Sequence, residues 1–290
     1  MKTIFLGKNC IEVDKVDSTN SYLARLIPGP FPKEKGEKAV FEGTVVIAGN
    51  QEQGKGQRGA SWESEPGKNL TLSIFLQPTF LRPDEQFQLN KAVSLGVTEF
   101  VIAALQTPPK SSPKGRTFAR GSLPFGESWS GVAVKWPNDI YISNKKVAGI
   151  LIENSVSGNK LQQSIIGIGI NVNQEKFSAE LPNPTSLKIV TGKEFDLKEC
   201  LEELCSCIEK RYLQLRPHPS PLPGGEGARQ AAIDSDYLKN LYRFGKFANY
   251  KYKGDTLKAK ITAVTKIGKL VMETENGKML ECDFKEVGFC

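Results

Sequence analysis

Residues 54–59 read Gly54-Lys55-Gly56-Gln57-Arg58-Gly59, and apolar stretches with strand character flank them at 44–48 and 70–76. The glycine spacing formally matches the dinucleotide motif G-x-G-x-x-G. That motif opens a helix, whereas Pro66-Gly67 leads directly into the second stretch, and no carboxylate ends the first to hold a ribose. The segment is therefore a plain flexible turn, or a glycine loop whose N–H groups and two cations can surround a phosphate.

The sequence after this loop contains segments with the periodicity of helices and of strands. One helix is predicted from about Pro83, where acidic residues suit the positive end of the helix dipole, and another from Asp196, which has Glu199 in capping-box position. Residues 143–145 are predicted to turn the chain of a hairpin. Further strands are predicted at 132–136, 147–152 and 165–172.

The chain divides by composition into a long and a short part. Short alternating strands separated by Gly254, Gly268 and Gly277 indicate a small β-barrel of roughly 50 residues at the C-terminus. We therefore predict one domain over 1–235 and a second over 236–290. Within the first, Pro/Gly-rich surface insertions are predicted near 28–37, 108–127 and 217–229.

Bulk composition excludes several classes of protein. The 290 residues carry a formal charge of +7, which suits acidic partners but does not choose among them. The start lacks a signal peptide and no segment is long and apolar enough to span a bilayer, so we expect a cytoplasmic protein with no membrane partner. The six cysteines lack C-x-x-C spacing and are expected to be free thiols. The one histidine, His218, lies in a Pro-rich stretch, which argues against most Ser-His, Cys-His and His-zinc chemistry.

Four further segments each have an ordinary interpretation when taken alone. Asp17-Ser18-Thr19-Asn20 is typical of a helix N-cap, and Asn138-Asp139 after a strand is typical of a turn. Lys145 and Lys146 are at a hairpin corner, where lysines are usually solvated. Residues 166–171 alternate isoleucine with glycine, so one face of that strand lacks side chains and leaves room for a ligand or another backbone.

Taken together, these segments resemble the biotin protein ligase family. The resemblance runs, in the family's order, through 17–20, the glycine loop with Trp62, 135–139, 146–151 and 167–173, and 268–287 is similar to its closing SH3-like domain. It implies an α/β fold with a mixed sheet, a class II synthetase-like catalytic domain followed by the SH3-like barrel. Bifunctional members also have an N-terminal DNA-binding domain, and Ser18 is too near Met1 for one here, so the monofunctional type without DNA binding is expected.

The resemblance also implies the chemistry: biotin and ATP form biotinyl-5′-AMP, and biotin passes to a lysine of a biotin carboxyl carrier protein of acetyl-CoA carboxylase or another biotin-dependent carboxylase. Mg²⁺ would accompany ATP, with no dedicated metal site. Lys146 and Asp139 would be catalytic. The implied biotin contacts are Ser18, Thr19, Asn20, Gln51, Lys55, Gly56, Gln57, Lys146 and Gly149, and the implied ATP contacts are Lys55, Gln57, Arg58, Trp62, Asn138 and Asn171.

The loop departs from the family pattern. Lys55 and Gln57 stand where the family commonly has arginine, so a bidentate fork is lost at both positions and a charge at the second, although Arg58 could compensate. Three alternatives stay open: a lipoate protein ligase, a catalytically inactive biotin-binding protein, and nucleic-acid binding, which lacks a recognition motif here. A monomer and a homodimer are equally compatible with the sequence.

Overall fold

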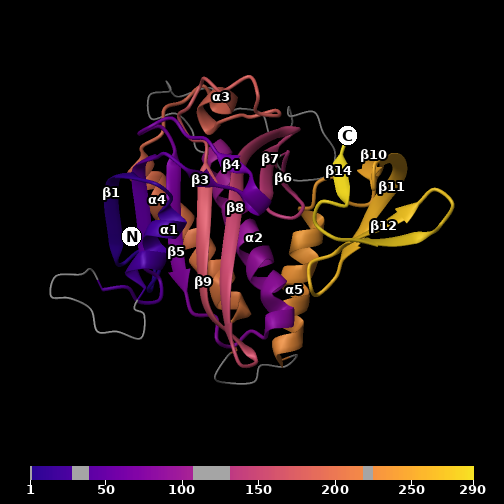
Figure 1. Ribbon diagram of the computed structural model, residues 1–290, viewed down its shortest axis with the longest axis horizontal. Coiled ribbons are helices and arrows are strands. Elements are labelled where there is room, and N and C mark those ends of the chain that lie inside the picture. Colours follow the sequence, from indigo (N-terminus) through magenta and orange to yellow (C-terminus); the bar gives the residue numbers. More distant parts are fainter. Residues whose placement is uncertain (1, 28–38, 107–130, 218–224) are drawn as a thin grey trace.

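The computed structural model describes residues 2–27, 39–106, 131–217 and 225–290. A seven-stranded mixed sheet organises the longer part, in the order β1-β2-β5-β9-β8-β7-β6 (Figure 1). β1 and β2 are parallel and the other neighbours are antiparallel. The strands are β1 (Cys10–Val16), β2 (Val45–Gln51), β5 (Leu70–Leu76), β6 (Val132–Lys135), β7 (Asp139–Ile142), β8 (Lys145–Ser157) and β9 (Lys160–Ile170).

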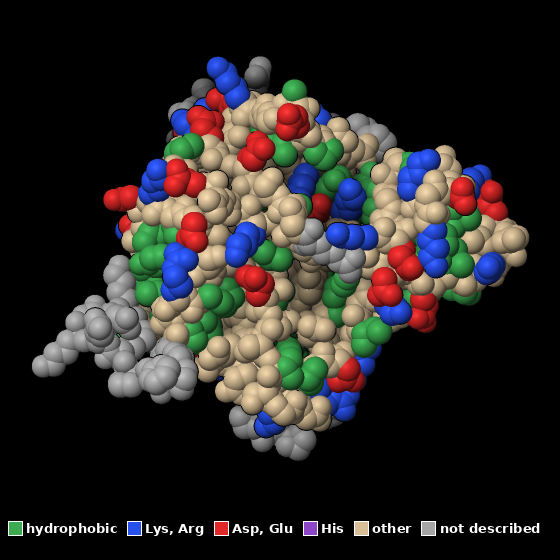
Figure 2. Space-filling model, in the orientation of Figure 1, with side chains coloured by type: hydrophobic (Ala, Val, Ile, Leu, Met, Phe, Trp, Pro, Cys, Tyr) green, Lys and Arg blue, Asp and Glu red, His purple; other side chains and the backbone are tan. Residues whose placement is uncertain are grey.

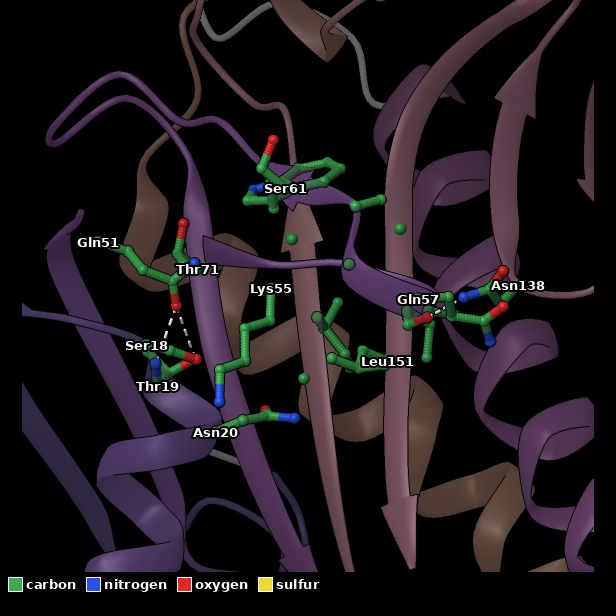
Figure 3. A pocket seen from close by; sticks show the side chains of 18 of the residues that line it. Ser18, Thr19, Asn20, Gln51, Lys55, Gln57, Ser61, Thr71, Asn138 and Leu151 are labelled. Atoms are coloured by element: carbon green, nitrogen blue, oxygen red, sulfur yellow. Dashed lines mark hydrogen bonds between the residues drawn. The ribbon is translucent and has the colours of Figure 1, made fainter. Parts of the chain in front are cut away.

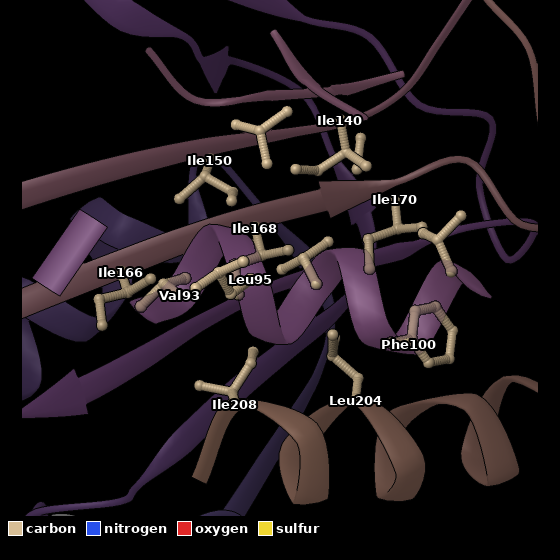
Figure 4. Packing of buried hydrophobic residues seen from close by; sticks show 14 of the residues in the cluster. Val93, Leu95, Phe100, Ile140, Ile150, Ile166, Ile168, Ile170, Leu204 and Ile208 are labelled. Carbon is tan, nitrogen blue, oxygen red and sulfur yellow. The ribbon is translucent and has the colours of Figure 1, made fainter. Parts of the chain in front are cut away.

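Helices cover one face of this sheet with a continuous apolar core. The isoleucines of β8 and β9 pack on α2 (Gln86–Gln106), and α4 (Leu197–Leu215) packs on the far side of α2 (Figure 4). Gly96 lets the two helices approach closely, because a Cβ there would lie 2.8 Å from Ile208 Cα. The predicted helices near Pro83 and Asp196 are confirmed: η2 (Pro83–Glu85) leads into α2, and Asp196 accepts the Glu199 N–H at the start of α4.

The opposite face carries α1 (Thr19–Leu26), which packs against β5 and β9. For this reason all residues of β5 are buried, although the alternation in its sequence predicts a strand with one inward face. A short ribbon of β3 (Gly54–Lys55) and β4 (Ser61–Trp62), joined by η1 (Gln57–Gly59), also belongs to this side. The small α3 (Leu187–Thr191) follows the sheet.

One sequence prediction is wrong in part. The Pro/Gly-rich insertion was expected over 217–229, but α5 (Gly225–Lys239) begins inside it; residues 218–224 lie outside the described part of the chain, as do most of the insertions near 28–37 and 108–127. The glycines disfavour a helix, but tertiary packing outweighs this preference. Ile233 and Tyr237 are fully buried, and Asp234 pairs with the buried Lys91 at 2.6 Å.

A five-stranded antiparallel sheet, in the order β13-β12-β11-β10-β14, forms the C-terminal part, as expected for a small β domain. The predicted boundary at 235 falls within α5, and we propose that the domains meet in the link 240–246. No helix in the described part of the chain has both the length and the apolarity needed to cross a membrane. The strands are β10 (Phe247–Tyr252), β11 (Asp255–Val264), β12 (Leu270–Thr274), β13 (Met279–Cys282) and β14 (Val287–Phe289).

Candidate functional site

A cavity of about 260 Å³ lies on the α1 side of the sheet, between the start of α1 and the β3–β4 ribbon. Its walls come from the start of α1, the end of β2, the β3–β4 ribbon, the starts of β5 and β7, the first half of β8 and the end of β9 (Figure 3). Figure 2 shows lysine and arginine side chains around a hollow on this side of the molecule. All the residues implied as biotin contacts line the cavity, namely Ser18, Thr19, Asn20, Gln51, Lys55, Gly56, Gln57, Lys146 and Gly149.

The N-terminus of α1 presents polar groups to the cavity. Ser18 is the N-cap residue by position, but its side chain makes no capping hydrogen bond. Instead, the Thr19 N–H donates to Gln51 Oε1 at 2.8 Å, so a side chain from β2 satisfies the helix start. Ser18 is therefore at the N-cap position, as the motif predicts, but its hydroxyl does not cap the helix and is available to a ligand.

Asn20 is held from three sides. Its Nδ2 donates to Glu153 Oε2 at 2.7 Å, and its Oδ1 accepts from Ser73 Oγ at 2.5 Å. On the third side is Gly167, where a Cβ would lie 2.5 Å from Asn20 Oδ1. The bare glycine in β9 thus makes room for a buried side-chain amide, whereas the Ile-Gly alternation predicts room for a ligand or another backbone.

Trp62 lies on the other glycines of the sheet. A Cβ on Gly169 would lie 2.2 Å from Trp62 Cε2, and one on Gly149 would lie 3.2 Å from Trp62 Cζ3. Lys146 Nζ lies 5.6 Å from the centroid of the indole. Within the described residues, Trp62 Nε1 is buried without a hydrogen-bond partner, so an acceptor brought by a ligand or water would satisfy it.

Lys146 and Asp139 form an ion pair in the cavity wall, with Nζ and Oδ1 2.7 Å apart. Backbone bonds hold Lys146 in place, because its N–H donates to Asn183 O at 2.8 Å and its carbonyl accepts from Thr185 N at 2.9 Å. Lys145, the preceding residue, is exposed and lies outside the cavity lining. The sequence alone does not distinguish Lys145 from Lys146, but in the structure only Lys146 lines the cavity.

The glycine loop contributes the side chains of Lys55 and Gln57 to the cavity wall. Lys55 Nζ donates to Ser21 Oγ at 2.7 Å, and Gln57 lines the cavity. The side chain of Arg58 lies outside the described part, so its proposed compensation for Gln57 stays a prediction. The ribbon formed by Gly54–Lys55 and Ser61–Trp62 gives the loop a defined base.

The implied ATP contacts are not all brought to the cavity. Lys55, Gln57, Trp62 and Asn138 line it, and Asn138 Nδ2 donates to the carbonyl of Ile150. Asn171 lies outside the lining, with Nδ2 donating to Thr185 O at 2.9 Å. Among the described residues its buried Oδ1 has no partner.

Lys135 begins the motif of residues 135–139 but lies outside the cavity lining. Its Nζ is 2.9 Å from Tyr141 Oη and 5.1 Å from the centroid of Phe289. Burial lowers the pKa of Lys135 and raises the pKa of Tyr141 to about 12. This lysine therefore joins the sheet to the C-terminal strand β14 and does not face the cavity with Lys146.

Sequence reasoning missed Ser73 and Glu153. Ser73 is a fully buried hydroxyl in the middle of the largely apolar strand β5, and a serine among aliphatic residues is a signal that the sequence does offer. Glu153 is exposed and reaches Asn20 only through the pairing of distant segments, so no local pattern indicates it.

The Biotin/lipoate A/B protein ligase family matches residues 31–171 of the chain. Almost half of the chain is thus covered by the model of this family. The bifunctional ligase/repressor BirA of Bacillus spizizenii is 31% identical over 222 residues, which are 75% of this chain and 58% of that protein. The chain thus spans little more than half the length of that relative.

Two further relatives match over a larger share of their own length. The biotin–acetyl-CoA-carboxylase ligase of Paracoccus denitrificans is 29% identical over 69% of this chain and 72% of its own. The biotin protein ligase from Aquifex aeolicus, solved in complex with biotin and ATP, superposes with a TM-score of 0.68 at 25% identity, over 97% of this chain and 98% of that one. The likeness to the Aquifex structure thus extends over the C-terminal sheet.

Proposed function

We propose that this protein is a biotin protein ligase, which activates biotin with ATP and transfers it to a lysine of a biotin carboxyl carrier domain. The observation that supports this most strongly is the composition of one cavity. A lysine–carboxylate pair, Lys146 and Asp139, lines the same cavity as a buried amide and hydroxyl set at the start of α1. Such a cavity suits an acid with a polar ring at one end and a carboxylate at the other.

Gln51 favours a urea over an apolar ring. Its Oε1 accepts the Thr19 N–H, so its Nε2 carries both remaining donors. Among the residues that the structure describes, Nε2 is paired with no acceptor, and the Ser18 hydroxyl makes no capping bond. A ureido carbonyl would accept from these donors, whereas the dithiolane ring of lipoate would leave them unpaired at a cost of roughly 1–3 kcal/mol each.

Lys146 supplies the charge that the first step needs. When a carboxylate oxygen attacks the α-phosphorus of ATP, a new P–O bond forms and the bond to the β-phosphate oxygen breaks, which releases pyrophosphate. Negative charge builds on the α-phosphate, so a preorganised cation stabilises the transition state. We propose that Lys146 bridges the biotin carboxylate and the α-phosphate, and that Asp139 holds its ammonium in place at 2.7 Å.

We propose that Mg²⁺ enters the site together with ATP. Mg²⁺ is commonly bound by one or two carboxylates together with substrate phosphates. No group of three or more His, Cys, Asp or Glu in the described residues could hold a metal ion unaided, and Asp139 is the carboxylate among the lining residues. The ion would supply charge neutralisation at the phosphates.

In the second step the acceptor lysine amine attacks the acyl carbon of the adenylate, and AMP leaves. The formal charge of +7 suits an acidic carrier domain, since complementary charge speeds association. We propose the carrier domain of acetyl-CoA carboxylase or another biotin-dependent carboxylase as the acceptor.

The first step is tested by ATP–pyrophosphate exchange with biotin or with lipoate as the acid. We expect exchange with biotin and little with lipoate. Exchange with lipoate alone would move the assignment to the other branch of the family. Exchange with neither acid, together with measurable biotin binding, would favour an inactive binding protein.

A further inference from the structure

A chain of short hydrogen bonds leads from the cavity to the protein surface. Thr19 Oγ1 lies 2.7 Å from Ser73 Oγ, Ser73 Oγ lies 2.5 Å from Asn20 Oδ1, and Asn20 Nδ2 lies 2.7 Å from Glu153 Oε2. Thr19, Ser73 and Asn20 are each at least 97% buried. Glu153 is exposed and is not part of the cavity lining.

The proton positions along this chain follow from its outer end. A carboxylate only accepts hydrogen bonds, so Glu153 requires the Asn20 amide to present Nδ2 to it. Asn20 Oδ1 then faces Ser73, and because an amide oxygen cannot donate, the single hydroxyl proton of Ser73 must point at Asn20.

The same reasoning fixes Thr19. Since the Ser73 proton is already used, the short contact between Ser73 and Thr19 is a hydrogen bond only if Thr19 donates. The alternative acceptor for the Thr19 hydroxyl is Gln51 Oε1 at 3.3 Å, which also lies within the protein. In both cases the Thr19 proton points inward, and Thr19 offers the cavity an oxygen lone pair.

We propose that Glu153 is a positioning residue that sets the direction of this hydrogen-bond chain, so that Thr19 accepts a ring N–H of the bound urea. The inference rests on the proposed function and deepens it. Gln51 Nε2 would donate to the urea carbonyl while Thr19 Oγ1 accepts the neighbouring N–H, and the two together match a cyclic urea.

A cation at position 153 would reverse the chain. An ammonium requires Asn20 to present Oδ1, so Nδ2 turns to Ser73 and Ser73 donates to Thr19. The Thr19 proton is then released from Ser73 and can point either at Gln51 Oε1 or into the cavity. When it points into the cavity, a ligand with a ring oxygen at that position finds a suitable donor.

The test measures dissociation constants for biotin and for the two cyclic carbamates in which oxygen replaces one or the other ring N–H of biotin. Wild-type protein should bind biotin more tightly than at least one carbamate by roughly 10–100-fold, the range for a buried group left unpaired. In Glu153→Lys this preference should fall by at least tenfold. All three ligands carry the same carboxylate, so a general electrostatic effect of the lysine cancels in the ratio.

Two variants serve as controls. Glu153→Gln keeps an acceptor for Asn20 and should bind biotin nearly as wild type does. Glu12→Lys makes the same charge change on an exposed residue of β1, away from the cavity, and should leave the ratio unchanged.

An unchanged ratio in folded Glu153→Lys would overturn the inference, as would an equal loss in Glu153→Gln or an equal loss of all three ligands. Wild-type protein that binds no biotin would instead contradict the proposed function, and this is seen before any variant is compared.

Discussion

Lys146 is the residue in which charge, position and proposed chemistry coincide. Replacing it with alanine removes a preorganised cation, so adenylate formation should fall on the order of 10²–10³-fold in single-turnover assays. Biotin affinity should fall much less, because the contacts of Ser18, Thr19, Asn20 and Gln51 remain.

Lys145 gives the matched control for this prediction. It precedes Lys146 but is exposed and outside the cavity lining, so Lys145→Ala should change the rate little. Lys146→Arg should not restore the full rate, because a planar guanidinium does not replace a compact ammonium. Equal losses in the two alanine variants would remove Lys146 from the chemical step.

At the level of single residues, the sequence locates the cavity wall but not the groups behind it. Ser18 and Lys146 lie in segments whose order along the chain resembles that of the biotin protein ligases. Both residues line one cavity in the structure. Glu153 and Asn20 are far apart in sequence and meet across the sheet through one hydrogen bond of 2.7 Å. Long-range pairing of this kind has no local sequence pattern.

At the level of elements, β9 shapes the cavity through its glycines. In Gly169→Ala the new Cβ would lie 2.2 Å from Trp62 Cε2, so the indole must move away from the sheet. We expect a shift in tryptophan fluorescence and a loss of adenylate formation on the order of 10²-fold, as small displacements of reacting groups can cause. Gly288→Ala, whose Cβ meets only a flexible lysine side chain closer than 3.9 Å, should change neither. Unchanged fluorescence in Gly169→Ala would show that Trp62 does not rest on β9.

The ribbon β3–β4 and its loop should determine how well the adenylate is retained. Gln57 lines the cavity, and the resemblance to biotin protein ligases implies an arginine at this position. Gln57→Arg adds a charge-assisted contact worth roughly 1.5–3 kcal/mol, so the adenylate should dissociate more slowly into solvent. Dissociation is followed by quenched-flow release from preformed complex. An unchanged off-rate would indicate that Arg58 already provides this contact.

Some secondary-structure elements can be predicted from the sequence more accurately than others. β5 spans the predicted residues 70–76, although both of its faces are buried, and α4 starts at the predicted cap. α5 is not predicted from the sequence because its first turn contains Gly225 and Gly227, which disfavour a helix, and because it directly follows a Pro-rich stretch. The packing of α5 on the core becomes visible only in the folded chain.

At the level of the whole molecule, the C-terminal sheet is bound to the turn that carries Asn138 and Asp139. Trp136 Nε1 donates to Gly268 O at 3.0 Å, and its ring stacks on Phe284 with centroids 5.0 Å apart. Trp136→Phe should leave the buried carbonyl of Gly268 unpaired and lower the free energy of unfolding by about 1–3 kcal/mol in urea titrations.

Phe247→Leu is the control for this change, since Phe247 is 46% exposed in the same sheet and should have little effect on stability. Trp136→Phe with wild-type stability would show that this hydrogen bond does not hold the sheet in place.

The central claim concerns the complete reaction and is tested by mass spectrometry of an acceptor. A biotin carboxyl carrier domain is incubated with the protein, biotin and ATP. We predict that the carrier gains the mass of one biotinyl group on one lysine, only when ATP is present, and that lipoate gives no product. A carrier of unchanged mass, or one modified equally well with lipoate or without ATP, would contradict the account.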